Sequence, residues 1–207
     1  MRRNRDGRPI GWHGVEDIEE SQSMPDAATA QPRRRSGSIY VCPLSAVPFT
    51  VRQSKACRLV TCLQDDITVE TPKLIAPDKH LRLPLHDIAA EVPGHIAPRE
   101  DHIEALIEFA RDWGGEGDMV VHCWAGISRS TAAAFTALCA INPLGYEAMI
   151  AARLRQASPT AHPNRLMIRL ADQSLGRGGR MVRAIEAIGP GSYASEGVPF
   201  ALPADHS

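Results

Sequence analysis

Several features that would assign this sequence to a common class of protein are missing from it. No stretch approaches the roughly 18 consecutive apolar residues that a membrane-spanning helix needs. The formal charge of −1 at pH 7 provides no general attraction for nucleic acid or for a membrane, so neither is expected as a partner. No apolar segment follows the basic start of the chain, so a secretory signal is not indicated and a cytoplasmic protein is expected.

The cysteines do not form a recognisable framework. There are five of them, an odd number, and no two are separated by only two residues, which argues against paired disulfides and against a zinc site. The histidines between residues 80 and 102 lack the carboxylate or cysteine spacing of metal ligands, so no metal or other cofactor is expected. Four cysteines are interpreted as small buried hydrophobic residues: Cys42, Cys57, Cys62 and Cys139.

The length of 207 residues accommodates one ordinary domain of roughly 150 residues with its own core, plus tails. Residues 1–37 are rich in charged and polar side chains without a sustained apolar period, and they are predicted to be a disordered extension. The globular domain is expected to cover residues 38–188. Residues 189–207 are expected to form a flexible C-terminal tail, and the protein is expected to be a monomer.

Four short apolar segments are typical of strands in a buried sheet, because each is rich in Val, Ile and Leu and is bounded by polar or Pro residues. They cover residues 39–44, 57–63, 80–85 and 118–123. Between the third and the fourth, apolar residues from Ile103 to Trp113 follow a helical spacing. A strand, a helix and a further strand in this order indicate a βαβ unit, whose two strands are parallel.

After residue 129 the pattern becomes helical. Residues 130–141 are apolar on all sides, as in a helix buried in a core, and two amphipathic helices are predicted at 145–157 and 163–176. A weaker helix is predicted at 180–188. The predicted fold class is therefore α/β, with a central, mostly parallel sheet of four to five strands flanked by helices.

The segment VVHCWAGISRSTAAAF, residues 120–135, brings reactive side chains to a turn between a strand and a helix. Cys123 ends the strand, and Arg129 follows it by six positions. A loop that turns this tightly can point successive backbone N–H groups inward, and the helix N-terminus adds about half a positive charge. An anion held there would lie over the sulfur, and the same donors would stabilise a thiolate.

The loop is therefore predicted to bind a phosphate group, with the planar guanidinium of Arg129 matched to two of its oxygens. The residues expected to surround the phosphate are Trp124, Ala125, Gly126, Ile127, Ser128 and Arg129.

The sequence HCWAGISRS resembles the signature H-C-x-x-G-x-x-R-[S/T] of the cysteine-based protein tyrosine and dual-specificity phosphatases, with every position of the signature filled. The resemblance extends over residues 39–175, and the length matches a compact, bacterial-type member. It implies that Cys123 attacks phosphorus to give a phosphocysteine and that Arg129 clamps the phosphoryl group. It also implies that the Ser130 hydroxyl assists release of the thiolate, while His122 orients the loop and favours the thiolate.

The family also uses an aspartate on a nearby mobile loop to protonate the leaving group. Asp87 is expected to fill this role, because it follows the C-terminal end of a predicted parallel strand, at the edge where the cysteine loop also lies. Asp65 and Asp66 lie at the same edge and are the alternatives. Asn164 resembles an asparagine position in a late helix of the family, and it is interpreted here as a helix cap.

The predicted function is hydrolysis of a phosphate monoester by a tyrosine or dual-specificity phosphatase, acting on a phosphorylated protein or a small phosphomonoester. A phosphoprotein-binding pseudophosphatase is one alternative, although such a protein normally has a damaged nucleophile or arginine and neither is damaged here. A phosphatase of small-molecule or lipid phosphates is another. Lipid-directed relatives tend to carry lysines in the loop, and WAGIS has none. A rhodanese-like sulfurtransferase is disfavoured because its loop lacks this pattern.

Overall fold

The structure is a computed structural model that describes residues 37–205 of the chain. Apart from Gly37, the extension predicted at 1–37 lies outside the described residues. Within 37–205 we find no helix with the length and apolar character needed to span a membrane.

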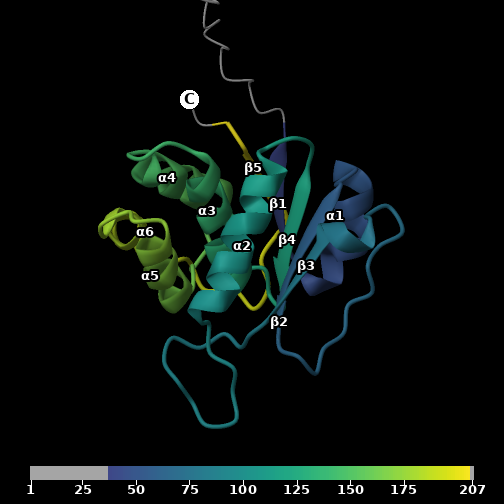
Figure 1. Cartoon of the computed structure of the whole chain (residues 1–207), viewed down its shortest axis with the longest axis horizontal. Coiled ribbons are helices and arrows are strands. Elements are labelled where there is room, and N and C mark those ends of the chain that lie inside the picture. The colour runs from purple at the N-terminus through teal and green to yellow at the C-terminus, as the bar shows by residue number, and fades with distance from the viewer. Residues whose placement is uncertain (1–36, 206–207) are drawn as a thin grey trace, which may run out of the picture. The chain divides into compact units, whose positions relative to one another are not determined.

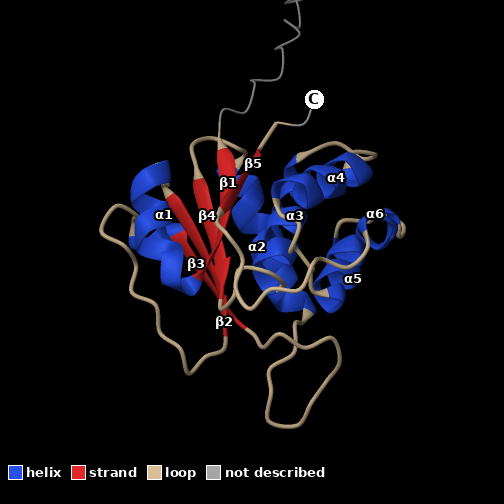
Figure 2. Ribbon diagram, turned by 180° about the vertical axis from the view of Figure 1, so that it is seen from behind, coloured by secondary structure: helices blue, strands red, loops and turns tan. Residues whose placement is uncertain are grey.

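One sheet of five strands forms the centre of the described part of the chain, in the spatial order β3-β2-β4-β1-β5 (Figure 2). The strands are β1 (Ser38–Pro43), β2 (Arg58–Leu63), β3 (His80–Pro84), β4 (Met119–Cys123) and β5 (Phe200–Pro203). The pairs β3/β2, β2/β4 and β4/β1 are parallel, whereas β5 is antiparallel to β1. The predicted α/β class with a mostly parallel sheet is therefore confirmed.

Helices cover the two faces of the sheet unequally (Figure 1). The first helix, α1 (Val47–Ser54), packs on one face, and the remaining α-helices of residues 37–205 gather on the other. These are α2 (Glu100–Trp113), α3 (Arg129–Ile141), α4 (Glu147–Ala157), α5 (Arg165–Ser174) and α6 (Arg180–Ile188). Two short 3-10 helices, η1 (Leu44–Ala46) and η2 (Pro77–Lys79), precede α1 and β3.

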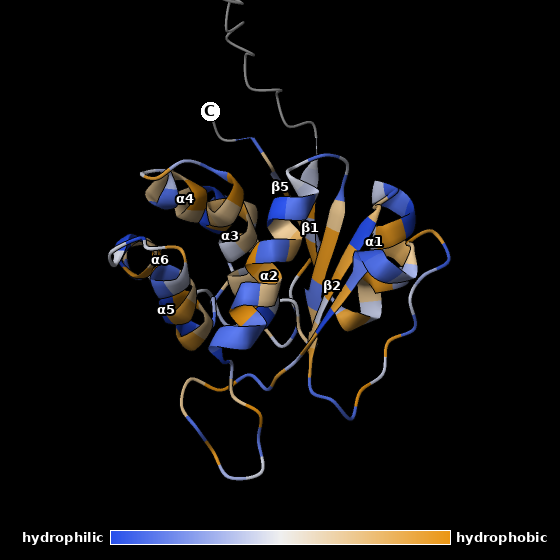
Figure 3. Cartoon of the chain, in the orientation of Figure 1, coloured by the Kyte–Doolittle hydropathy of each residue, from blue (hydrophilic) through white to orange (hydrophobic). Residues whose placement is uncertain are grey.

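The predicted crossover helix is present as α2. Ile103, Leu106 and Ala110 are fully buried on its inner side, while much of its outer surface is hydrophilic (Figure 3). The helix ends at Gly114, which adopts a left-handed φ of 59° that glycine tolerates without strain. The helices predicted at 130–141, 145–157, 163–176 and 180–188 are also present, as α3 to α6.

The unit that carries the predicted phosphate loop lies in the middle of the domain. β4 is hydrogen-bonded on both sides, to β1 and to β2, and α3 follows it after residues 124–128. Every residue of α3 except Ala140 is buried, as expected for a helix that is apolar on all sides. A strand and a helix that are both enclosed in the core give the intervening loop two fixed ends.

α1 was not predicted from the sequence. It has only eight residues, so its apolar period is too short to be distinguished from a loop. Val47 and Val51 bury one side of it against the sheet, in a second, smaller core cluster on that face. Its stability therefore comes from packing and not from an intrinsic helical signal.

The C-terminal segment also differs from the flexible tail expected at 189–207. Residues 200–203 form β5 on the open edge of β1, where Leu202 pairs with Ile39. Leu202 and Ala204 are buried, and the Ala204 amide donates to the carbonyl of Gly37. The physical reason is the free edge of β1, which offers backbone hydrogen bonds that a short extended segment can complete.

Candidate active site

The predicted phosphate loop joins Cys123, the last residue of β4, to Arg129, the first residue of α3. Gly126 in its middle has a φ of +72°, the left-handed region that favours glycine. A Cβ atom added there would lie 2.7 Å from the Pro43 nitrogen and 2.8 Å from the carbonyl carbon of Cys42. The loop can therefore follow this path against β1 only with glycine at position 126.

The backbone carbonyls of the loop are turned away from its centre, because amides of neighbouring segments bind four of them. The bonds run from Leu44 to Trp124 (3.1 Å), from Gly197 to Ala125 (2.8 Å), from His162 to Ile127 (2.9 Å) and from Asn164 to Ser128 (3.3 Å). In a trans peptide the C=O and the following N–H point in opposite directions. The amides of Ala125, Gly126, Ser128 and Arg129 consequently face inward, as an anion-binding loop requires.

The sulfur of Cys123 lies at the bottom of this loop. Its Sγ is 3.3 Å from the amide nitrogen of Gly126, which donates to it, and 3.1 Å from Oγ of Ser130. The Cys123 residue itself is buried. An N–H donor and a hydroxyl thus lie within hydrogen-bonding distance of the buried sulfur.

Three of the other cysteines are also buried, and burial dominates their pKa. Burial raises the pKa of Cys42 to about 12, and it also raises the pKa of Cys62 and of Cys139 well above the ordinary range of a thiol. These three are inert hydrophobic residues, as interpreted from the sequence. The prediction that Cys57 is buried is wrong, because this residue lies just before β2 and is exposed.

His122 precedes Cys123 in β4 and is fully buried. Burial lowers its pKa to about 4, although a backbone interaction with Cys123 acts in the opposite direction. The imidazole is therefore neutral near pH 7, and any influence on the sulfur must come through hydrogen bonds. Its Nε2 lies 2.7 Å from Oγ1 of Thr61 on β2.

Arg129 is buried beside the sulfur and only partly paired. Its Nη1 donates to the carbonyl of Leu85 at 3.1 Å, while its Nε lies 3.9 Å from Oδ2 of Asp87. Among residues 37–205, no partner accepts a hydrogen bond from this Nε. A buried guanidinium donor left without a partner is costly, and an oxyanion in the loop would satisfy it.

Asp87 lies in the same pocket and is held by two donors. Its Oδ1 accepts from Oγ of Ser128 at 2.7 Å and from Nδ2 of Asn164 at 2.8 Å. Asp65 and Asp66, the alternatives from the sequence, are not among the residues that line the pocket. Of these three aspartates, Asp87 alone lines the pocket.

Asn164 has a second task that the sequence analysis did not foresee. As expected, its Oδ1 caps α5, accepting from the amides of Leu166 and Met167 at 3.1 Å each. Its Nδ2 also donates to Asp87 and, at 3.2 Å, to the carbonyl of Ile88. One side chain therefore ties the start of α5 to the loop that follows β3.

The pocket over Cys123 has a volume of about 320 Å³. Besides the loop and Asp87, it is lined by Gln64, Ala194 and Ser195. The last two belong to the C-terminal segment, whose Gly197 also binds the loop carbonyl of Ala125. No pattern in the sequence indicated this wall, because residues 189–199 contain no motif and no apolar period.

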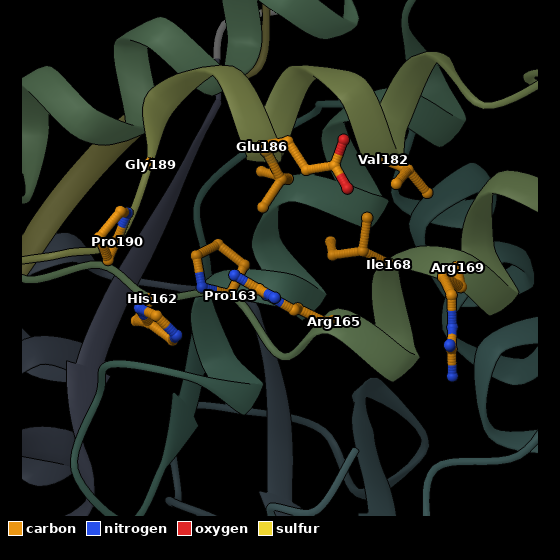
Figure 4. A pocket seen from close by; sticks show the side chains of 10 residues that line it. His162, Pro163, Arg165, Ile168, Arg169, Val182, Glu186, Gly189 and Pro190 are labelled. Carbon is orange, nitrogen blue, oxygen red and sulfur yellow. The ribbon is translucent and has the colours of Figure 1, made fainter. Parts of the chain in front are cut away.

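A pocket of similar size, about 330 Å³, lies between α5 and α6 (Figure 4). Ile168 and Val182 lie along it, with Arg165 and Glu186 beside them. No cysteine lines this second pocket, so it lacks the thiol that the signature places in the pocket over Cys123. Within the described residues, no group of three or more His, Cys, Asp or Glu side chains is placed to hold a metal ion.

Comparison with known structures identifies the class of fold as that of the tyrosine and dual-specificity phosphatases. The crystal structure of DUSP15 matches with a TM-score of 0.50 and 18% identity, over 73% of this chain and 96% of that chain. The human tyrosine phosphatase-like serine/threonine/tyrosine-interacting protein matches with a TM-score of 0.50 and 18% identity, over 69% and 97%. No protein-family model and no curated protein matches the sequence. The fold implied by the signature is confirmed.

Proposed function

We propose that this protein hydrolyses phosphate monoesters of the kind found in phosphorylated proteins, through a phosphocysteine on Cys123. The observation that carries the proposal is the shared pocket of three groups. It holds a sulfur with two hydrogen-bonding neighbours, a buried Arg129 with an unpartnered Nε, and the carboxylate of Asp87.

In the first step the Cys123 thiolate attacks phosphorus, so that an S–P bond forms while the bond from phosphorus to the leaving oxygen breaks. The inward amides of the loop and the guanidinium of Arg129 hold the equatorial oxygens of the phosphoryl group. Asp87 supplies a proton to the leaving oxygen, which departs as an alcohol or a phenol.

In the second step a water molecule attacks the phosphocysteine, and Asp87 takes a proton from this water. The S–P bond breaks, inorganic phosphate is formed, and the electron pair returns to sulfur. The hydroxyl of Ser130, 3.1 Å from Sγ, and the amide of Gly126 stabilise the thiolate that leaves. The proton that Asp87 takes up in this second step replaces the proton that it gave to the leaving oxygen in the first step.

The position of Asp87 suits both steps. Ser128 and Asn164 fix its Oδ1, whereas its Oδ2 accepts no hydrogen bond from the described residues and lies 3.9 Å from Nε of Arg129. The interaction with Asn164 also limits the rotation of the carboxyl group, which keeps Oδ2 on the side of the pocket.

Phosphoprotein substrates are favoured by the surroundings of the pocket. Trp124 at its rim is 58% exposed and offers a flat apolar surface to a peptide or an aromatic ring. The loop has no lysine that would meet the additional phosphates of a phosphoinositide. One of the two similar structures is described as phosphatase-like, so the fold alone does not establish turnover. The intact cysteine and arginine favour an enzyme here.

The proposal is tested by hydrolysis of p-nitrophenyl phosphate without added metal. Wild type is expected to release p-nitrophenol, and Cys123→Ser to release none above background, because a serine hydroxyl stays protonated at neutral pH. Cys57→Ser, which alters an exposed thiol away from the pocket, is the matched control and should keep wild-type turnover. Full activity of Cys123→Ser would overturn the proposal.

A further inference from the structure

A continuous series of hydrogen bonds runs through the buried sheet to His122. Oγ1 of Thr61 on β2 lies between two imidazoles, 2.7 Å from Nε2 of His122 and 2.8 Å from Nε2 of His80. Nδ1 of His80 lies 2.8 Å from Oγ1 of Thr71, and Nη2 of Arg82 donates to the same Thr71 oxygen at 2.9 Å. We call these five residues the polar relay.

The relay is unusual for its place in the fold. His80, Thr61 and His122 are all buried and lie on three adjacent parallel strands, where Val, Ile or Leu are ordinarily found. Burying three polar side chains is costly unless each of them is hydrogen-bonded. Valine has nearly the shape of threonine and would fill position 61 without that cost. The polar row is therefore not explained by packing.

One order of donors and acceptors satisfies every hydrogen bond of the relay. Arginine can only donate, so Thr71 accepts from Arg82 and has its own proton available for Nδ1 of His80. In this order His80 carries its proton on Nε2 and would donate to Thr61, whose hydroxyl would donate in turn to Nε2 of His122.

This direction leaves the proton of His122 on Nδ1. That atom has no well-formed hydrogen bond within residues 37–205, but its interaction with the Cys123 backbone acts to raise the pKa of His122. A ring N–H facing a carbonyl has this effect. The opposite direction would place a lone pair there instead.

Both imidazoles are neutral in this arrangement. Burial lowers the pKa of His80 to about 4, as it does for His122, with further lowering of the His80 pKa by the charge of Arg82. A neutral imidazole has one donor and one acceptor nitrogen, so its tautomer is fixed by its neighbours. The relay thereby sets which nitrogen of His122 carries the proton.

We propose that Thr61 and His80 are positioning residues, which act through His122 to hold the backbone of Cys123 and to favour the thiolate. The inference rests on the proposed function in taking Cys123 as the nucleophile. In that order of donors the hydrogen bonds polarise one another along the series to His122, and a ring N–H beside Cys123 would favour negative charge on the sulfur. Removal of Thr61 breaks the relay and frees the ring of His122.

The other groups that act on the sulfur lie outside the relay. Arg129 and Ser130 on α3 and Asp87 after β3 surround Cys123 from the pocket side. The thiols of Cys42 on β1 and Cys62 on β2 are close enough to interact with it electrostatically. No hydrogen bond links Arg129, Asp87 or Ser130 to Thr61 or His80 among the described residues. A change at Thr61 therefore tests the relay separately from the pocket.

The test measures the rate at which iodoacetamide alkylates Cys123, as a function of pH, in a Cys57→Ser background that removes the exposed thiol. In Thr61→Val the midpoint of the profile is expected to move upward by about one pH unit, the size of one ordinary hydrogen bond. Thr61→Ser restores the hydroxyl and should return the midpoint to the wild-type value. A purely structural role for Thr61 would lower stability without moving this midpoint.

A second variant covers the case in which Thr61→Val does not fold. Arg82→Leu removes the exposed end of the relay, and Arg52→Leu on α1 is its matched control. Arg82→Leu should shift the midpoint in the same direction by a smaller amount, and Arg52→Leu should not. An unchanged midpoint in the folded variants overturns the inference even if turnover is normal. If the midpoint shifts in these variants but wild type has no phosphatase activity, the inference about the relay is supported and the proposed function is rejected.

Discussion

At the scale of single residues, Asp87 is the side chain whose role depends most on its neighbours. Asp87→Ala is expected to lower kcat for p-nitrophenyl phosphate by roughly 10²- to 10⁴-fold, the usual effect of removing a general acid. Asp65→Ala provides the matched control, because Asp65 is at the same edge of the sheet but does not line the pocket. Steady-state kinetics of the two variants decide whether Asp87 or Asp65 is the general acid. A larger loss of kcat in Asp65→Ala than in Asp87→Ala would assign this role to Asp65.

The signature residues were predictable from sequence because they are contiguous. His122, Cys123 and Arg129 lie in one short segment, and the chemistry of an anion-binding loop follows from their order. The hydrogen bond that holds Asp87 in place was not predictable in the same way. Its partner Asn164 lies 77 positions further along the chain, and only the folded structure brings the two together.

At the scale of elements, Asn164 links α5 to the loop after β3. Asn164→Ala should lower the free energy of unfolding by about 0.5–2 kcal/mol, because the N-cap of α5 is lost, and it should lower kcat as well. Asn164→Asp keeps an oxygen to cap the helix but places a second carboxylate against Asp87. It should therefore retain most of the stability and still lose turnover.

Urea unfolding and kinetics of both Asn164 variants distinguish these effects. If Asn164→Asp were as active as wild type, the contact between Nδ2 and Asp87 would have no part in catalysis. If Asn164→Ala were as stable as wild type, the two hydrogen bonds from Leu166 and Met167 would not contribute to the stability of α5.

The elements that sequence reasoning missed share a physical cause. α1 has eight residues and β5 has four, so neither contains enough residues to display a period. Both are stabilised by the sheet they pack on or pair with, which the local sequence does not encode. The strands and helices that were predicted are longer or more apolar, and their burial pattern is visible in the sequence itself.

At the scale of the whole molecule, the buried histidines make stability depend on pH. The pKa of His122 is about 4 in the folded protein, compared with an ordinary value near 6.5. Between these two values the unfolded chain binds a proton that the folded chain does not. Keeping His122 neutral therefore contributes roughly 3 kcal/mol to the free energy of unfolding. This contribution is complete above pH 6.5 and is lost as the pH falls toward 4.

Urea unfolding of wild type and His122→Gln at several pH values between 7 and 4.5 checks this expectation. Wild type should lose stability steeply over this range, and the variant should show a shallower dependence. Equal slopes for the two proteins would mean that His122 already takes up its proton in the folded state.

The C-terminal segment shows how distant parts of the chain complete one site. Residues 194 and 195 line the pocket, Gly197 binds the loop, and β5 secures the segment to the edge of the sheet. The pocket is therefore bounded by segments from both halves of the domain, although its reactive groups come mainly from β4, the loop and α3.

The central claim is that Cys123 becomes covalently phosphorylated during turnover. The most direct measurement is mass spectrometry of acid-quenched Asp87→Ala during reaction with p-nitrophenyl phosphate, because loss of the base slows hydrolysis of the intermediate. We predict the added mass of one phosphoryl group on the peptide that contains Cys123, and none in Cys123→Ser. Substrate turnover with no phosphoryl group on Cys123, or with one on another residue, would contradict the account.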